Sequence, residues 1–243
     1  MRQARDEMSV TPGSRPGTEP GDDSGSPCVW LRADRPQRAD RPLSRSRIVA
    51  EAMALLDEEG IERLTMRRLA ERLGTGSTTL YWHVATKDDV LDLTLDALLG
   101  EVPLPAPGGD WRSDLRTLLL AWRATLLRHP WSACLLGRPM LGPNTLARVE
   151  FLQAALVRAG LTGRHLTAAT WALCGQVTGA ATTHAAFRLT AGEHRAVHTH
   201  LWTHRDTYPA LAAHGRLPDE HDEDDFAAGL DYLLDGIEAA TTR

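Results

Sequence analysis

Residues 77–84, with the sequence STTLYWHV, carry hydroxyl and aromatic side chains in a spacing that suits contact with nucleic acid. In a helix, which turns by about 100° per residue, Leu80 and Val84 form one apolar stripe. The side chains farthest from this stripe are those of Thr78, Thr79 and Trp82, and those that flank it are Tyr81 and His83. Hydroxyls bond to base edges or phosphates and aromatic rings contact thymine methyls, so this pattern predicts a helix in the major groove of DNA.

Basic side chains close to this segment could add contacts with phosphates or bases. Arg67 and Arg68 lie just inside a preceding helical stretch, and Lys87 lies at the start of the following one. Together with the hydroxyl and aromatic face, these cations indicate a DNA-binding surface.

Other residue groups that could carry chemistry give weaker signals. Four histidines form two i, i+4 pairs on different faces of one expected helix, at positions 194/198 and 200/204, whereas zinc normally takes at least three protein ligands. Residues 74–77, GTGS, lack the lysine of a phosphate-binding loop. No Ser/His/Asp spacing or HExxH motif indicates catalysis, so we expect no enzyme, no metal site and no cofactor.

Short helices and their turns must position the DNA-binding side chains. Apolar residues at helical spacing predict helices over about 44–60, 65–73, 77–84 and 86–100. Thr65 is expected to cap the second helix, and Thr86 with Asp89 forms a capping signature for the fourth. Two short helices joined by a glycine-containing turn, with another helix behind them, are the parts of a helix-turn-helix.

A Pro/Gly-rich boundary, EVPLPAPGGD at 101–110, separates this head from a larger helical body. The helices expected in the body cover about 111–128, 131–137, 143–159, 164–188, 193–205 and 223–240. No stretch alternates at period two for long enough to predict a strand. We therefore expect an all-α protein with a DNA-binding domain over 42–100 and a second helical domain over 101–243.

Residues 1–41 are rich in Gly, Pro, Ser, Asp and Arg and have no apolar period, so we expect a disordered tail. Between positions 32 and 47, six arginines face only two aspartates. This local positive charge could seek DNA phosphates or could serve only to keep the tail solvated, and both interpretations remain open.

Composition limits the class of protein. The 243 residues carry a net charge of −5, so a nucleic-acid partner requires a local basic face. No run of about 18 apolar residues predicts a membrane span, and the first residues lack the apolar region of a secretory signal. The three cysteines are too scattered for a disulfide framework, which favours a cytoplasmic protein.

The segment from Ile48 to Leu98 resembles the DNA-binding domain of the tetracycline repressor (TetR) family. Residues 52–92 read AMALLDEEGIERLTMRRLAERLGTGSTTLYWHVATKDDVLD, and TLYWHV is similar to the recognition helix of the tetracycline repressors. The resemblance implies a homodimeric, ligand-responsive transcriptional regulator, in most cases a repressor that a small-molecule inducer releases from a palindromic operator in double-stranded DNA. The alternatives are activation, or an all-α ligand-binding or catalytic protein that does not bind DNA.

The resemblance also implies the roles of individual side chains. Base contacts are implied for Arg67, Ser77, Thr78, Thr79 and Trp82, and phosphate contacts for Thr65, Tyr81, His83 and Lys87. The tetracycline repressors have Gln-Pro where this chain has Ser77-Thr78. We therefore expect a different operator.

The body resembles the C-terminal domain of the same repressors in LLGRP at 135–139 and in the last helix. The family pairs two long helices with those of a second subunit, which implies that 164–188 and 223–240 form the dimer interface. The small residues that would permit close approach are Gly175, Gly179, Ala180 and Ala181. The apolar seam would consist of Leu230, Leu233, Leu234 and Ile237, although an intramolecular core would use the same residues.

Induction requires a ligand that binds better to the DNA-incompetent state. We expect its pocket between the 111–128 and 164–188 helices. The expected lining is mostly apolar, and ordinary core packing remains open for about half of it: Trp122, Trp131, Cys134, Met140, Trp171, Gln176, Thr183, His184 and Phe187.

The tetracycline repressors hold their drug as a magnesium chelate, with a histidine at the position of Cys134. The tetracycline repressors also carry an acidic residue late in the long helix. This chain lacks it and has Thr183 and His184 nearby instead. Because Mg²⁺ prefers oxygen and carboxylate ligands, we expect a metal-independent, largely hydrophobic inducer and no tetracycline response.

Overall fold

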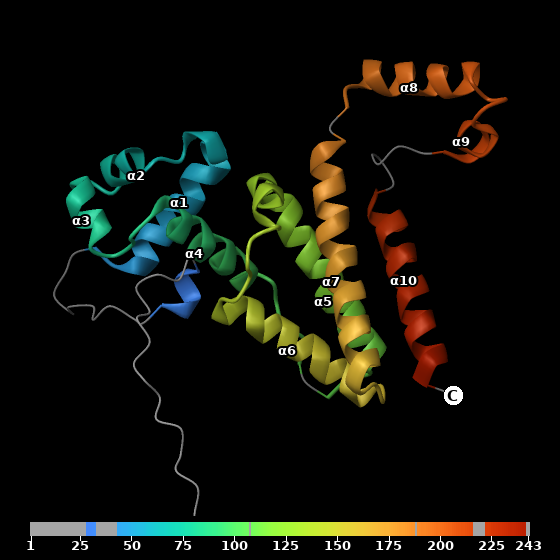
Figure 1. Cartoon of the computed structure of the whole chain (residues 1–243), viewed down its shortest axis with the longest axis horizontal. Helices are drawn as coiled ribbons and strands as arrows, with labels where there is room; N and C mark the ends of the chain where they lie inside the picture. Colours follow the sequence, from blue (N-terminus) through green and yellow to red (C-terminus); the bar gives the residue numbers. More distant parts are fainter. Residues whose placement is uncertain (1–27, 33–42, 107, 188, 216–221, 242–243) are drawn as a thin grey trace, which may run out of the picture.

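The computed structural model describes residues 28–32, 43–106, 108–187, 189–215 and 222–241, and these residues contain helices and no strand. A small helical head lies at one end of the long axis and a larger helical body at the other (Figure 1). The expected all-α class is confirmed for the described residues. None of their helices is long and apolar enough to cross a lipid bilayer.

The head contains α1 (Arg45–Glu59), η3 (Ile61–Arg63), α2 (Met66–Arg72), α3 (Ser77–Tyr81) and α4 (Lys87–Gly100). Ser44 starts α1 because its hydroxyl accepts a hydrogen bond from the Arg47 N–H, and Gly60, at φ +80°, ends it. Thr86 and Asp89 form the expected capping box of α4. The core of the head contains the apolar positions that the helical periods predict, among them Ile48, Leu55, Leu69, Leu80 and Val84.

The body is built on α5 (Trp111–Arg128), which contacts α6 (Pro143–Arg158), α7 (Gly163–Ala186) and α10 (Asp222–Thr241). Its helices agree with the expected ones to within two residues at each end. The segment expected as a helix over 131–137 is instead the 3-10 helix η4 (Pro130–Leu135). Pro130 opens η4, and the six residues are too few to favour full α-helical turns.

Two helices, α8 (Ala191–Thr203) and α9 (Pro209–His214), project from the end of α7 (Figure 1). They pack mainly on each other, and neither contains a buried residue. The sequence pattern missed α9, because six residues between Tyr208 and Gly215 are too short to display a helical period.

The aliphatic residues that were expected to form the seam on α10 face their own chain. Leu230, Leu234 and Ile237 are buried against the body, and Leu233 is half-buried. Arg112 and Arg116 of α5 add ion pairs with carboxylates on α10. The expected intermolecular leucine seam is therefore wrong, and the intramolecular alternative holds for these residues.

The helix α4 joins head and body through polar side chains spaced four residues apart. Asp92 accepts a hydrogen bond from Arg138 at 2.5 Å. Asp96 accepts the backbone N–H groups of Asn144 and Thr145, at 3.3 and 2.9 Å. Because Gly142, the cap residue of α6, has no side chain, Asp96 caps that helix from a neighbouring element.

Residues 28–32 correct one expectation about the tail. They include the 3-10 helix η2 (Val29–Leu31), which contacts α4. Cys28 is buried and Arg32 forms an ion pair with the buried Asp89. This segment is ordered because it has apolar surface to bury and a buried carboxylate to bind; the rest of 1–41 lies outside the described residues.

Candidate nucleic-acid interface

The turn between α2 and α3 sets the orientation of the recognition segment. The Thr65 hydroxyl accepts a hydrogen bond from the Arg68 N–H at 3.1 Å and starts α2. At the other end, the Thr75 N–H donates to the Ala70 carbonyl at 3.0 Å, and Gly74 takes a φ of +65°. A left-handed backbone at this position favours glycine, so the chain can turn sharply into α3.

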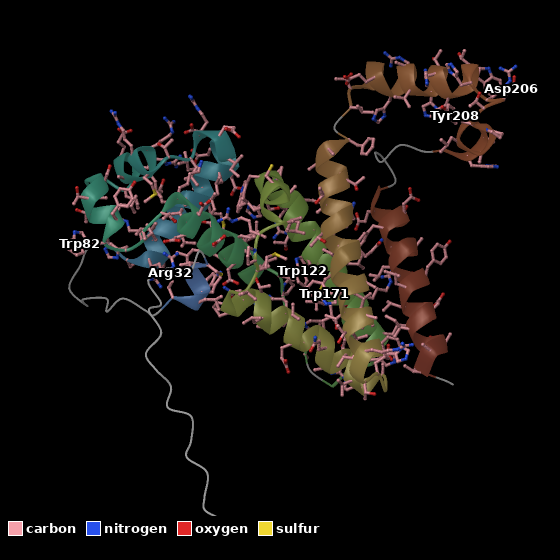
Figure 2. All side chains as sticks on the ribbon, in the orientation of Figure 1. Arg32, Trp82, Trp122, Trp171, Asp206 and Tyr208 are labelled. Atoms are coloured by element: carbon pink, nitrogen blue, oxygen red, sulfur yellow. The ribbon has the colours of Figure 1, made fainter. Side chains whose placement is uncertain are left out.

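Residues 77–84 have one buried apolar face and one exposed face, as the spacing predicted. Leu80 and Val84 are buried beneath α3. On the opposite side, Thr78 and Thr79 are exposed and Trp82 is 64% exposed. Trp82 lies at the end of the molecule opposite α10 (Figure 2).

The side chains that flank this face differ in exposure. Tyr81 is 46% exposed, whereas Ser77 and His83 are half-buried. The helix α3 is shorter than expected, but its turn continues because the Trp82 and His83 N–H groups donate to the carbonyls of Thr79 and Leu80. The whole 77–84 segment therefore keeps a helical course.

The three basic residues named from the sequence have different surroundings. The Arg67 side chain is 86% exposed and donates to Glu71 at 2.9 Å, which raises the pKa of Arg67. Arg68 forms an ion pair with Glu59, at the end of α1. Lys87 is half-buried and donates to the Ile61 carbonyl at 3.5 Å.

Arg72, behind the interface, binds α2 to α1. Its guanidinium bonds to Glu51 and Glu58, and these bonds raise the pKa of Arg72. They also lower the pKa of the Glu58 carboxyl. These ion pairs thus help to hold α1 and α2 together.

A polar contact between head and body was missed by the sequence analysis. The Asp57 carboxylate, on α1, lies 2.7 Å from the His129 Nδ1 and accepts the Trp131 indole N–H at 2.6 Å. His129 Nε2 lies 3.2 Å from Glu101, just after α4. No local spacing could reveal a contact between residues more than 70 positions apart.

Among the described residues, the nine that are expected to line an inducer pocket differ widely in exposure. Trp122 and Trp131 are buried, and the exposed members are Cys134, Trp171, Thr183 and Phe187. Met140, Gln176 and His184 are half-buried. His184 lines a cavity of about 10 Å³ between α5, η4 and α7, which is only large enough for about one water molecule.

Trp171 requires a correction. It lies on the outer face of α7, 72% exposed, whereas Leu173 and Val177 form the buried stripe of the same helix. Helical periodicity groups residues by face but does not say which face meets a neighbour. Within one chain, Trp171 does not line a pocket.

A helix-turn-helix with an exposed second helix, followed by a larger helical domain, defines a DNA-binding regulator. Residues 48–93 match the family described as "Bacterial regulatory proteins, tetR family". Residues 104–241 match "Tetracyclin repressor-like, C-terminal domain". The chain belongs to the TetR family of bacterial transcriptional regulators.

Individual relatives agree with this assignment. An HTH-type transcriptional regulator from Saccharopolyspora erythraea is 42% identical over 220 residues, 88% of this chain and 93% of that protein. The class D tetracycline repressor protein of Escherichia coli is 41% identical over 90 residues, 36% of this chain and 41% of its own. The crystal structure of the Streptomyces coelicolor TetR family protein ActR in complex with actinorhodin has a TM-score of 0.76 and 29% identity, and the match covers 84% of this chain and all of that one.

Proposed function

We propose that the protein is a ligand-responsive repressor that binds a palindromic operator as a homodimer and is released by a small-molecule inducer. The observation that carries the proposal is the exposed face of Thr78, Thr79 and Trp82, set opposite a buried apolar stripe. The Trp82 ring is 64% exposed, and an exposed aromatic ring beside two hydroxyl groups suits contact with bases in a groove.

We assign the DNA-binding domain to residues 42–100 and the ligand-binding and dimerisation domain to residues 101–243. Within the first domain, Arg67, Ser77, Thr78, Thr79 and Trp82 contact bases, and Thr65, Tyr81, His83 and Lys87 contact phosphates. Arg68 supports these contacts from its ion pair with Glu59, where it holds α2 against α1.

The dimer proposal rests on the outer faces of α7 and α10. On α7, Trp171, Gly175 and Gly179 form an exposed stripe at a spacing of four residues, and no side chain from the described part of the molecule covers either glycine. On α10, Tyr232 is 76% exposed and Gly236 is equally uncovered. Small residues beside single large aromatic ones permit close approach of paired helices from a second subunit.

The inducer proposal rests on α5. The Trp122 side chain is buried, and its indole N–H has no hydrogen-bond acceptor among the described residues. A buried donor without a partner is costly, and a ligand oxygen would remove that cost. ActR, a TetR family protein of similar fold, was solved in complex with actinorhodin, which supports a ligand site in this fold.

We further propose an apolar inducer that binds without a metal ion, and a cytoplasmic regulator without catalytic activity. Cys134 and Thr183 are uncharged, and burial raises the pKa of the nearby Cys174 thiol, which stays protonated at neutral pH. None of these groups is a favourable ligand for Mg²⁺. Tetracycline with Mg²⁺, titrated into the protein–operator complex, should leave the complex intact; release of the DNA at micromolar drug would contradict this proposal.

The function is tested by fluorescence anisotropy with DNA from upstream of the protein's own gene. Trp82→Ala should weaken binding by at least about tenfold, as expected for an interface hot spot. Trp202→Ala is the matched control, because Trp202 is 65% exposed on α8 and lies far from the head. Both variants should keep the helical circular dichroism of the wild-type protein.

Two results would contradict the proposal. One is wild-type binding that is neither selective for sequence nor weakened by salt, because a specific repressor depends on both base and phosphate contacts. The other is an equal effect of the Trp82 and Trp202 substitutions on binding.

A further inference from the structure

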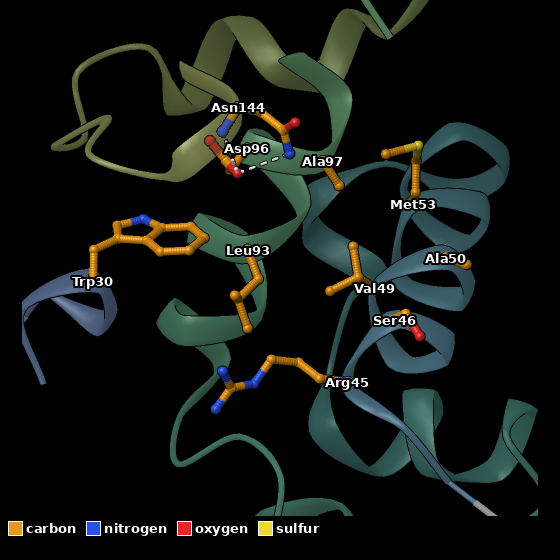
Figure 3. Close-up of a pocket in the computed structure, with 10 residues that line it drawn as sticks. All are labelled: Trp30, Arg45, Ser46, Val49, Ala50, Met53, Leu93, Asp96, Ala97 and Asn144. Atoms are coloured by element: carbon orange, nitrogen blue, oxygen red, sulfur yellow. Dashed lines mark hydrogen bonds between the residues drawn. The ribbon is translucent and has the colours of Figure 1, made fainter. Parts of the chain in front are cut away.

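A pocket of about 420 Å³ lies at the junction of head and body, between η2, α1, α4 and the start of α6. Figure 3 shows it open between the Trp30 ring on one side and Val49 and Met53 on the other. Its volume falls within the range of small-molecule sites, which is roughly 300–1,000 Å³. None of the nine residues considered for the inducer pocket lines it.

The walls of the pocket are apolar. The Trp30 ring forms one wall, and Val49, Met53, Leu93 and Ala97 supply aliphatic surface from α1 and α4. An aromatic wall opposite aliphatic side chains favours a flat apolar molecule, because both faces of such a molecule then leave water.

The ends of the pocket are polar and unlike each other. Asp96 and Asn144 lie at one end, and the Arg45 guanidinium lies at the other (Figure 3). The Asp96 carboxylate already accepts four hydrogen bonds from Asn144 and Thr145, so it has little capacity for a ligand. The Arg45 guanidinium lines the other end and stays charged, so this end favours a ligand group with negative charge.

The wall that Trp30 provides depends on the docking of η2. Cys28 is buried, and the ion pair between Arg32 and Asp89 fixes the segment to the start of α4. Two independent contacts therefore hold the aromatic ring over the pocket in the protein without a ligand. Such preorganisation lowers the entropy lost when a ligand binds.

We propose that this pocket is a second small-molecule site, which takes a flat, apolar, aromatic compound with one anionic group directed at Arg45. The ligand contacts α1 and α4 of the head together with the start of α6 in the body. The site is thus separate from the inducer pocket of the proposed function.

Anilinonaphthalene sulfonate is a suitable probe, because it combines fused aromatic rings with one sulfonate. Its binding to the full-length protein is measured by isothermal titration calorimetry and by its own fluorescence, without DNA. Ala97→Phe, which fills the pocket, should remove one equivalent of bound probe per chain. Ala154→Phe, at an exposed position on α6 outside the pocket, is the matched control and should keep the wild-type number of equivalents.

Arg45→Gln tests the anionic end, because it removes the positive charge and leaves the apolar walls of the pocket unchanged. It should weaken binding of the probe at this site by about tenfold, the effect of losing one hydrogen bond to a charged group. Circular dichroism and cooperative thermal unfolding show that each variant is folded. Wild-type stoichiometry in Ala97→Phe, or wild-type affinity in Arg45→Gln, would overturn the proposal. Because DNA is absent, neither result depends on whether the protein is a repressor.

Discussion

The Arg67 side chain, at 86%, is more exposed than that of Arg68, at 42%, and its neighbour Glu71 affects how it can meet DNA. The two side chains form an i, i+4 ion pair at 2.9 Å on the exposed side of α2. An exposed pair of this kind contributes little to stability. The ion pair does hold the Arg67 guanidinium close to α2 in the free protein. DNA must therefore compete with Glu71 for the N–H donors of Arg67.

Replacement of Arg67 by Ala should therefore lower operator affinity with little effect on folding. We expect a loss of about 1–3 kcal/mol that is concentrated at one base pair, as for an arginine that reads guanine. A set of operator variants, each changed at one position and measured by fluorescence anisotropy, locates that base pair.

Glu71→Ala serves as the control for loss of the ion pair itself. It removes the competitor and leaves the guanidinium, so operator affinity should stay the same or rise. If Arg67→Ala instead weakens binding equally for every operator variant, Arg67 contacts a phosphate rather than a base.

The sequence predicted the α3 face well and the other polar contacts poorly. Thr78, Thr79 and Trp82 could be placed because exposure on a short helix follows from its own period. The partner of Arg68, which is Glu59, and the partner of Trp131, which is Asp57, depend on how helices pack. Pairings between distant residues do not appear in a local pattern, and for that reason the 72% exposure of Trp171 could not be predicted.

At the scale of helices, the predicted boundaries were accurate where side chains start or stop a helix. Asp110 caps α5, and His129-Pro130 ends it, so its predicted range is the observed one. The errors fall on η4 and α9, which are each six residues long, and on α3, which ends at Tyr81 rather than at Val84. Segments this short have no stable helical preference of their own, and their neighbours decide their form.

The junction of α4 and α6 allows a sharp test of helix capping between elements. A methyl group added at Gly142 would collide with the side chain of Asp96, whereas no atom lies within 4 Å of one added at Gly137. Gly142→Ala should displace the carboxylate from the start of α6 and lower the free energy of unfolding by about 1–3 kcal/mol. Urea denaturation measures the difference.

Gly137→Ala is the matched control in the same connection, and it should change the free energy of unfolding by less than about 0.5 kcal/mol. Equal stability of the two variants would show that Asp96 moves aside without cost and that its contacts with Asn144 and Thr145 do not stabilise the junction.

At the scale of the whole molecule, the proposed dimer rests on the outer stripe of α7. Changing both Gly175 and Gly179 to Arg should convert the proposed dimer into a monomer, because two long cations replace the small residues where helices would meet. Glycine has low helix propensity, so the substitutions should not disrupt α7 itself. Sedimentation velocity measures the mass, which should fall to that of one chain. Operator affinity should fall as well.

The same two positions changed to Ala provide the control, since a methyl group still permits close approach and the dimer should persist. A dimer that survives both arginines would show that the outer face of α7 does not form the interface.

The contact of Asp57 with His129 and Trp131 has a consequence for how the protein is synthesised. It closes a loop of more than 70 residues, and contacts between such distant residues form late because the chain must first lose the entropy of the loop. The helices of the head form from local contacts. The contact of Asp57, on α1, with the body forms only after residue 131 has left the ribosome. During translation, the side chains that we propose to contact DNA are therefore all present before the body can fix their position, and a chain truncated before His129 would keep that state permanently.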